Sequence, residues 1–300
     1  MNEIHLICNP TSGKGKTLTT LDRIKEWLNA NPKLNVQIHL TENVGHATSL
    51  ARDLTKGDNK VTLLVLGGDG TVNEVLNGIV NFKTTHLGIL PFGSGNDFVR
   101  ALKIINPDPI DLMKAYLSNP KVMNVDYLLL NDKYRAINEI GLGMSAEVIN
   151  YRNKMKHFSP ETQYKIASTV RALFWKSFTY NLSIDKNPSS KINSMWFTMN
   201  NGIAVGSGMV TAPDAKIDDG LISVSFVKKF NRLKTLSLLM KCKKGKMAYM
   251  KETGRFTCKE IDIDTDIDTV VEFDGNLLEH QKHINVKIVP QELKLLVVEK

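Results

Sequence analysis

The chain has 300 residues, of which 42% are hydrophobic and 23% are charged, and its formal net charge is +8. This composition is typical of a globular protein and excludes an intrinsically disordered chain. No apolar run reaches the ~20 residues that cross a bilayer, and the N-terminus lacks the pattern of a signal peptide, so we expect a cytoplasmic protein. The length favours two domains, because one domain has roughly 150 residues. The three cysteines lie far apart, which argues against a disulfide framework or a zinc site.

The first 125 residues alternate between strand-like and helix-like segments. We expect strands at 4–8, 36–40, 61–66 and 86–90, and helices at 18–29, 46–55 and 72–80. This order predicts a three-layer α/β domain, in which helices cover both faces of a parallel sheet.

Four polar loops follow the predicted strands, at 9–16, 41–45, 67–71 and 91–97. Each contains residues that can bind phosphate. Ligands of parallel sheets bind at the carboxyl ends of the strands, so the four loops together indicate a ligand site at one edge of the sheet.

The third loop is the most informative. Gly67-Gly68-Asp69-Gly70-Thr71 lies between an apolar strand and residues with helical spacing. The first N–H groups of a helix have no intrahelical partner, and glycines let phosphate reach them. A carboxylate at Asp69 repels phosphate unless a divalent cation or a proton lies between them, and this pairing suggests metal-assisted chemistry on a nucleotide. The alternative is an ordinary strand–helix turn with a solvated Asp69.

The first loop ends like a P-loop, but Pro10 occupies the position of the first glycine, so it is not a Walker A loop. The hydroxyls of Thr11 and Ser12, the backbone N–H groups and the lysines can still bind phosphate. Residues 90–98, which include the fourth loop, are a second polar turn of this kind and lie directly before a predicted helix. Plain loops remain the alternative for both segments.

After Val125 the segments become short and alternating, which predicts a second domain built mainly of antiparallel β-structure. Residues 163–177 read as a helix within it. The run 292–298 is strand-like, and its pattern is compatible with either domain.

Two segments of the second domain combine carboxylates with glycine turns. Residues 212–221 can fold backbone oxygens and a carboxylate around a hard cation. Residues 272–276 end a strand, where a carboxylate could face a cleft. Surface turns are the alternative for both.

The segment 226–256 holds ten basic residues and one acid, Glu252. Within it Leu233, Leu236, Leu239 and Met240 recur at helical spacing. Such a helix can lie on an anionic membrane, or it can pack on a core with its basic side in water. Nucleic acid is not expected as a partner, since no nucleic-acid motif accompanies the charge.

Taken in order, these motifs resemble the diacylglycerol kinase catalytic-domain family, which is related to sphingosine kinases and distantly to NAD kinases. The matching segments are 9–13, Thr41 with 45–47, 67–73, 90–97, 212–221 and 274–275. The resemblance implies a C-terminal β-sandwich and an α/β ATP-binding domain of residues 1–125 plus 290–300, with residues 126–289 forming the lipid domain. It implies an ATP- and Mg²⁺-dependent lipid kinase of phospholipid metabolism that acts on a lipid hydroxyl, such as that of diacylglycerol, at the anionic inner membrane face.

The resemblance also assigns site residues. The ATP site it implies consists of Asn9, Pro10, Thr11, Ser12, Gly13, Thr41, Gly67, Gly68, Asp69, Gly70, Thr71, Val72, Asn73 and Ser94. A structural magnesium would be held by the carbonyl groups of Lys216 and Leu221 and by Asp219. We expect Asp69 to organise metal–ATP and Asp274 to be the catalytic carboxylate near the acceptor.

One departure from the family pattern affects catalysis. The family has Asp-Gly-Glu near the C-terminus, with the glutamate as general base, whereas this chain has Asp274-Gly275-Asn276. Positioned general-base catalysis contributes roughly 10²–10⁴-fold. Either Asp274 or Glu279 substitutes, or the protein is a non-catalytic nucleotide- or lipid-binding relative. An NAD kinase is the same-class alternative, and the oligomeric state, including a homodimer, is left open.

Overall fold

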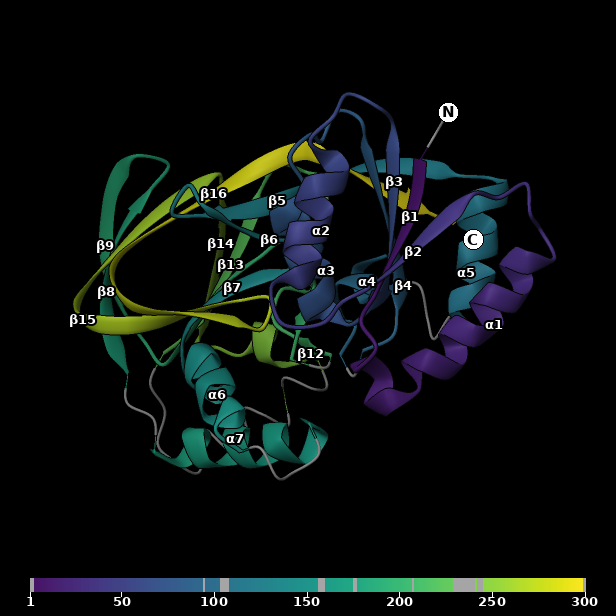
Figure 1. Cartoon of the computed structure of the whole chain (residues 1–300). Helices are drawn as coiled ribbons and strands as arrows, with labels where there is room; N and C mark the ends of the chain where they lie inside the picture. Colours follow the sequence, from purple (N-terminus) through teal and green to yellow (C-terminus); the bar gives the residue numbers. More distant parts are fainter. Residues whose placement is uncertain are drawn as a thin grey trace. The chain divides into compact units, whose positions relative to one another are not determined.

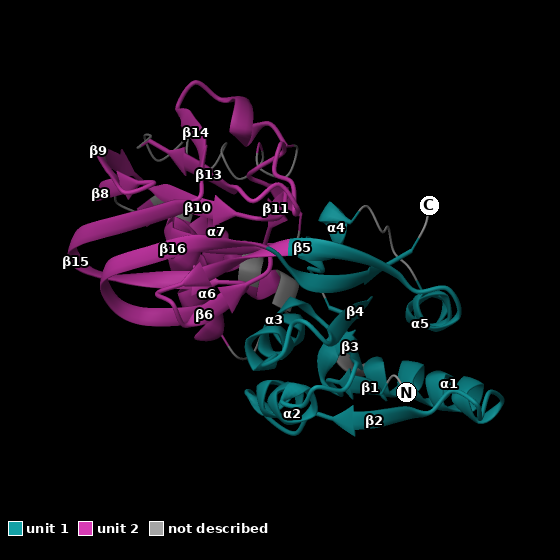
Figure 2. Ribbon diagram, turned by 90° about the horizontal axis from the view of Figure 1, so that it is seen from above, with its two compact units in different colours: residues 1–125, 291–300 teal, residues 126–290 magenta. Residues whose placement is uncertain are grey.

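The computed structural model describes residues 3–93, 95–102, 108–155, 160–174, 177–206, 208–228, 241 and 245–298. The chain divides into two compact units, which Figure 2 shows in different colours. Unit 1 comprises residues 1–125 and 291–300, and unit 2 comprises residues 126–290. Among the described helices, none is both long and apolar enough to span a membrane.

Unit 1 alternates strands and helices along the chain. Its elements are β1 (Glu3–Cys8), a 3₁₀ turn η1 (Ser12–Gly15), α1 (Thr17–Asn29), β2 (Val36–Leu40), α2 (His46–Thr55), β3 (Val61–Gly67), α3 (Asp69–Gly78), β4 (Thr85–Pro91), α4 (Asp97–Ala101) and α5 (Pro109–Ser118). The sheet order is β16-β4-β3-β1-β2, where β16 contributes the end of its long strand Asn276–Val297. All four pairings in this order are parallel, as the alternating pattern predicts.

Helices cover both faces of this sheet (Figure 1). Every residue of β3 is buried, because a parallel sheet between two helical layers has no solvent face. Leu64 and Leu66 face the α1 and α5 side, in a core cluster with Ile24 and Tyr116. On the other side α2 and α3 pack against β3 and against each other.

Unit 2 is mainly antiparallel. It contains the second half of β5 (Lys121–Leu130), then β6 (Tyr134–Ala136), β7 (Glu139–Gly143), α6 (Met144–Asn153), α7 (Pro160–Phe174), β8 (Phe178–Ile184), β9 (Asn187–Ser194), β10 (Trp196–Asn200), β11 (Ala204–Val205), β12 (Met209–Val210), β13 (Ile222–Val227), a 3₁₀ turn η2 (Met247–Tyr249), β14 (Thr253–Cys258), β15 (Glu260–Phe273) and the first part of β16. The main strand order is β14-β13-β10-β7-β15-β16, with the β8–β9 hairpin paired to β15.

The interior of unit 2 is one apolar cluster drawn from nearly all these strands, including Leu128, Ile140, Phe197, Ile263 and Val286. Alternate residues of each strand point into it, which is the pattern of a β-sandwich core. A second cluster, rich in methionine, lies where α6 and α7 pack on β10 and η2; it includes Met144, Met195 and Met247.

Two helices that the sequence predicts after residue 125 can now be compared with the structure. The helix expected at 163–177 is α7, which begins three residues earlier. The amphipathic basic helix expected within 226–256 falls largely on residues 229–240 and 242–244, which lie outside the described residues.

Candidate functional site

The four loops that follow β1 to β4 lie side by side at the carboxyl edge of the unit 1 sheet. Backbone hydrogen bonds join them to neighbouring strands: Thr41 N to Cys8 O (2.9 Å), Asn9 N to Leu66 O (3.0 Å) and Phe92 N to Gly67 O (2.8 Å). The parallel register therefore brings together four loops that are far apart in the sequence. This is the edge at which ligands of such sheets bind.

Asn9 connects the first loop to the third. Its Nδ2 donates to Thr71 Oγ1 at 3.0 Å, while its Oδ1 accepts from the backbone N–H (3.0 Å) and the hydroxyl (2.8 Å) of Thr11. Thr71 is buried and Thr11 is exposed. Asn9 thus fixes the loop and leaves Thr11 facing solvent.

The rest of the first loop is a short folded turn. The carbonyl of Ser12 accepts a hydrogen bond from Thr17 Oγ1 at 2.6 Å, and Gly13 has a φ of 59°, in the left-handed region. Pro10 and Ser12 are half-buried. The described part of this loop therefore offers backbone groups and the hydroxyls of Thr11 and Ser12, and Lys16 is exposed beside them.

The third and fourth loops approach closely at two glycines. A Cβ added to Gly93 would lie 2.5 Å from the Cα of Gly68, so no larger residue fits at Gly93 without a backbone shift. Asn96 closes the same loop, because its Oδ1 accepts the N–H of Gly93 at 2.9 Å. Ser94, which belongs to the ATP site implied by the resemblance, lies outside the described residues.

Asp69 begins α3 and connects it to the fourth loop. Its Oδ1 accepts the backbone N–H of Asp97 at 2.9 Å. The residue before it, Gly68, is the extended N-cap of the helix and has no side chain. A carboxylate at a helix N-terminus is stabilised by the helix dipole. Asp69 is half-buried, and it lies at the carboxyl edge of the sheet.

Not every residue of the 67–73 segment can offer its side chain to a ligand. Val72 and Asn73 are 4% and 2% exposed, and Thr41 is 9% exposed. Gly70, in contrast, is exposed and has open space where a Cβ would lie. Phosphate could therefore approach this turn through the backbone of Gly68 to Gly70.

In unit 2, Asp274 and Gly275 form the two-residue turn between β15 and β16. Both have positive φ, 45° and 87°, as a tight type I′ hairpin requires, and Phe273 pairs directly with Asn276 across it. Asp274 is 7% exposed. Its carboxylate accepts the backbone N–H groups of Ile137 (2.6 Å), Asn138 (3.0 Å) and Glu139 (2.9 Å). The carboxylate thus orders the segment that leads into β7.

Two further buried carboxylates lie beside this turn. Glu272 is 2% exposed and its Oε1 accepts the N–H of Gly275 at 2.6 Å, while Glu139 is 6% exposed. The register places Glu272 opposite Gly141 of β7, two residues from Glu139. Glu139 lies in none of the sequence motifs described above. It begins β7, whose five residues are all buried, and its signal in the sequence is an acid directly before the apolar residues Ile140 and Leu142.

The predicted cation loop is built around buried Asp126. The N–H of Asp126 donates to Ile217 O at 2.7 Å, and its Oδ2 accepts the N–H of Gly220 at 2.7 Å. Asp219 is exposed, and its Oδ1 accepts the N–H of Leu221 at 3.1 Å. One carboxylate and backbone carbonyls are the hard oxygen donors that Mg²⁺ and Ca²⁺ prefer, so the donor set fits such an ion. The described residues contain no group of three or more His, Cys, Asp or Glu side chains that could hold a metal. An ion at this loop would therefore depend on backbone oxygens as well as on Asp219.

Comparisons with known proteins identify the family. A sequence model of the diacylglycerol kinase catalytic domain matches residues 3–128. A model of the YegS C-terminal NAD kinase beta sandwich-like domain matches residues 138–297. A Staphylococcus aureus (strain Mu3 / ATCC 700698) protein named "Putative lipid kinase" is 30% identical over 299 residues, which cover 97% of this chain and 93% of the relative. This chain belongs to the diacylglycerol kinase catalytic-domain family.

Solved structures share the fold of this diacylglycerol kinase family member. A "putative diacylglycerol kinase" from Bacillus anthracis (strain Sterne) superposes with a TM-score of 0.77 at 23% identity, covering 98% of this chain and 94% of the other. An NAD kinase from Archaeoglobus fulgidus in complex with ATP is more distant, with a TM-score of 0.56 at 14% identity and coverage of 100% and 95%. The predicted family and fold class, an α/β unit with a parallel sheet and a C-terminal β-sandwich, are both confirmed.

Proposed function

We propose that the protein is an ATP- and Mg²⁺-dependent lipid kinase, which transfers the γ-phosphoryl group of ATP to a hydroxyl of diacylglycerol or a related lipid. The turn Gly67–Thr71 carries the proposal. It joins an open helix N-terminus, an exposed glycine backbone and a fixed carboxylate at the ligand edge of the sheet. Family membership supports a lipid acceptor, and the ATP-bound NAD kinase with this fold supports ATP as the donor.

The loops after β1 to β4 would bind the phosphates through backbone N–H groups and the hydroxyls of Thr11 and Ser12. Asp69 would orient the metal–ATP complex. When bound, Mg²⁺ neutralises charge on the phosphates. A structural ion would be held by Asp219 and by the carbonyls of Lys216 and Leu221. Asp274 acts in this proposal through the 137–139 backbone that it orders, which includes the N–H of Glu139.

The test is transfer of labelled γ-phosphate from ATP to mixed micelles of diacylglycerol, monoacylglycerol, sphingosine, ceramide or phosphatidylglycerol, with NAD as a further acceptor. Asp69→Asn keeps an oxygen that accepts the Asp97 N–H but removes the charge. We expect it to lower transfer at least about 10²-fold, because metal electrostatics contribute several kcal/mol. Asp58→Asn, an exposed acid of the same unit, is the control. Unchanged turnover in Asp69→Asn would overturn the assignment, and labelled NAD would identify an NAD kinase.

Asn276 supports a second candidate, a non-catalytic protein that binds nucleotide or lipid. It occupies the family's general-base position, and an amide does not accept a proton at neutral pH. ATP binding without turnover on any acceptor would favour this candidate. A higher transfer rate in Asn276→Glu would instead show a kinase that lacks an optimal base.

The acceptor of a lipid kinase lies in a membrane, and the basic segment 226–256 supports docking on an anionic surface. Its described residues Lys241 and Lys246 are exposed. Neutralising Lys241, Lys243, Lys244 and Lys246 should reduce co-sedimentation with anionic vesicles. The same number of neutralised lysines in unit 1, Lys25, Lys56, Lys60 and Lys83, is the control. Equal losses in both variants would contradict a specific docking face.

A further inference from the structure

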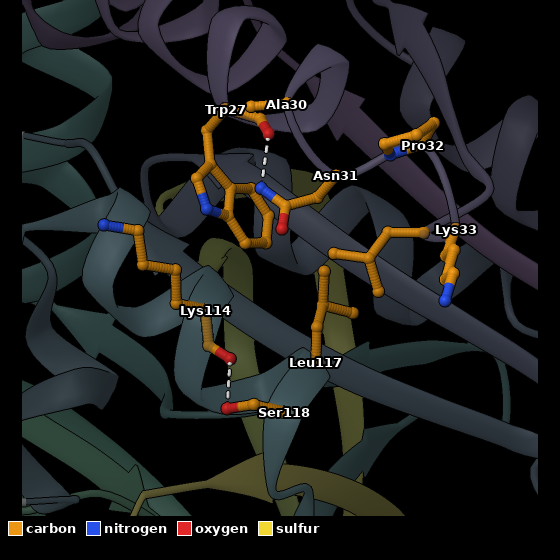
Figure 3. A pocket seen from close by; sticks show the side chains of 9 residues that line it. Trp27, Ala30, Asn31, Pro32, Lys33, Lys114, Leu117 and Ser118 are labelled. Atoms are coloured by element: carbon orange, nitrogen blue, oxygen red, sulfur yellow. Dashed lines mark hydrogen bonds between the residues drawn. The ribbon is translucent and has the colours of Figure 1, made fainter.

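Unit 1 has a cavity of about 570 Å³ between the ends of α1 and α5 (Figure 3). Its lining is Trp27, Ala30, Asn31, Pro32, Lys33, Leu34, Lys114, Leu117 and Ser118. None of these residues belongs to the four loops of the proposed nucleotide site. The volume lies in the range of pockets that bind small molecules, ~300–1,000 Å³.

Hydrogen bonds preform the walls of this cavity. At the end of α1, Asn31 Nδ2 donates to Trp27 O at 2.8 Å, and the turn continues with Leu34 N donating to Asn31 O at 2.9 Å. On the opposite wall, Ser118 Oγ donates to Lys114 O at 2.7 Å. Ligand binding would therefore not carry the entropy cost of ordering a loop.

The lining combines an apolar interior with positive charge. Trp27, Leu34 and Leu117 are half-buried, whereas Lys33 and Lys114 are exposed. Figure 3 shows the two ammonium groups on opposite sides of the apolar residues. No lining residue is acidic among those that the structure describes.

Neither lysine is strongly neutralised by a neighbour. Lys114 Nζ lies 3.4 Å from Asp111 Oδ1, but this pair is one turn apart on a helix surface and Asp111 is 76% exposed, so the pairing is weak. Within the described part of the chain, Lys33 has no ion pair. Both ammonium groups can therefore attract a bound anion.

We propose that this cavity binds a free single-chain anionic amphiphile, an alkyl chain that ends in a carboxylate or a phosphate. The chain would pack on Trp27, Leu34 and Leu117, and the anionic head would lie within reach of Lys33 or Lys114. The volume matches one small molecule, which favours a monomer over a membrane surface. The inference does not depend on the proposed kinase activity.

The test is a fluorescence titration of the full chain with dodecanoate, dodecyl phosphate and dodecyltrimethylammonium below their micelle concentrations. Trp27 is part of the lining, so the anions should shift tryptophan emission to a saturable end point. Trp27→Phe should remove that shift, which separates it from Trp175 and Trp196. We expect the cation to bind at least tenfold more weakly.

Charge variants identify the site. Lys33→Gln/Lys114→Gln should weaken dodecanoate binding about threefold, because the head can pair with one exposed ammonium group at a time and one such ion pair contributes on that order. The control Lys25→Gln/Lys56→Gln changes the net charge equally on the same unit and should bind like wild type. Equal binding of the cation, equal weakening in the control, or no saturable shift would each overturn the proposal. Binding only to phosphatidylglycerol vesicles, lost in Lys33→Gln/Lys114→Gln, would assign the cavity to membrane docking and overturn it too.

Discussion

The carboxylate of Asp274 accepts three backbone N–H groups from consecutive residues of unit 2. An asparagine at this position would turn an NH₂ group toward at least one of these donors. Because hydrogen bonds to charged groups contribute about 1.5–3 kcal/mol, we expect Asp274→Asn to lower the free energy of unfolding by at least about 2 kcal/mol. Urea unfolding followed by tryptophan emission in a Trp27→Phe background reports on unit 2. The control Asp266→Asn changes an exposed acid of β15, the strand that precedes this turn, and a midpoint shift as large as that of Asp274→Asn would contradict the argument.

His5 and His39 form a second residue-scale pair, on neighbouring strands of unit 1. His5 Nδ1 and His39 Nε2 are 3.1 Å apart, so one ring donates to the other, and His5 is 2% exposed. Burial lowers the pKa of both histidines, and for His5 the Glu3 carboxylate, 3.7 Å away, opposes that shift only in part.

These lowered pKa values make unit 1 less stable in acid. Below pH ~6.5 the unfolded chain takes up protons that the folded pair does not, so stability is full above that pH and falls as the pH drops below it. His86, whose pKa is lowered by burial and by Lys294 and Lys60, acts in the same direction. Thermal midpoints between pH 7.5 and 5.5 should fall less steeply in His5→Leu/His39→Leu than in wild type. An unchanged slope in the double variant would refute the expectation.

At the scale of elements, α2 and α3 pack so closely that only glycine fits where they cross. A Cβ on Gly78 would overlap the carbonyl oxygen of Thr48 and lie 2.7 Å from the Cβ of Ala51. Thr48 Oγ1 also donates to Glu74 O at 2.9 Å, which holds the two helices together. We expect Gly78→Ala to lower the free energy of unfolding by about 1–3 kcal/mol through overpacking. Urea midpoints measure this loss. Gly70→Ala in the same helix has open space around its Cβ and should be neutral; equal losses would contradict the packing argument.

The elements also show what sequence patterns can predict. Of the unit 1 elements, helix α5 is not among the expected helices, but strands β1 to β4 and helices α1 to α3 can be predicted because burial on one or both faces imposes their periods, and the loops at the sheet edge follow from that order. Helix α6 cannot, because its buried residues Met144, Ala146, Val148 and Ile149 do not form a single apolar stripe. The structural roles of Asp274 and Asn9 could not be predicted either, because their hydrogen-bond partners are distant in the sequence. The cavity beside Trp27 likewise forms only when α1 and α5 pack.

At the scale of the whole molecule, β16 supplies residues to both units. Its last part pairs with β4 in unit 1, where Leu293, Leu295 and Leu296 are 0%, 0% and 2% exposed. Burying a leucine contributes about 1.5–3 kcal/mol, so losing three removes an amount comparable with the ~5–15 kcal/mol that stabilises a domain.

A chain that ends at Pro290 should therefore lose the cooperative unfolding of unit 1 and keep that of unit 2. Calorimetry and limited proteolysis measure the two units separately. A chain that ends at Val298 is the control and should behave like the full chain. A normal unit 1 transition in the shorter chain would show that β16 is dispensable there.

The same strand sets an order of events during synthesis. When β1 to β4 leave the ribosome, the edge of β4 has no neighbour, because the residues that cover it are made only after all of unit 2. An open sheet edge invites pairing with other chains. Unit 1 therefore remains incomplete until translation has passed Leu296, and this interval is when the nascent chain most needs protection from aggregation.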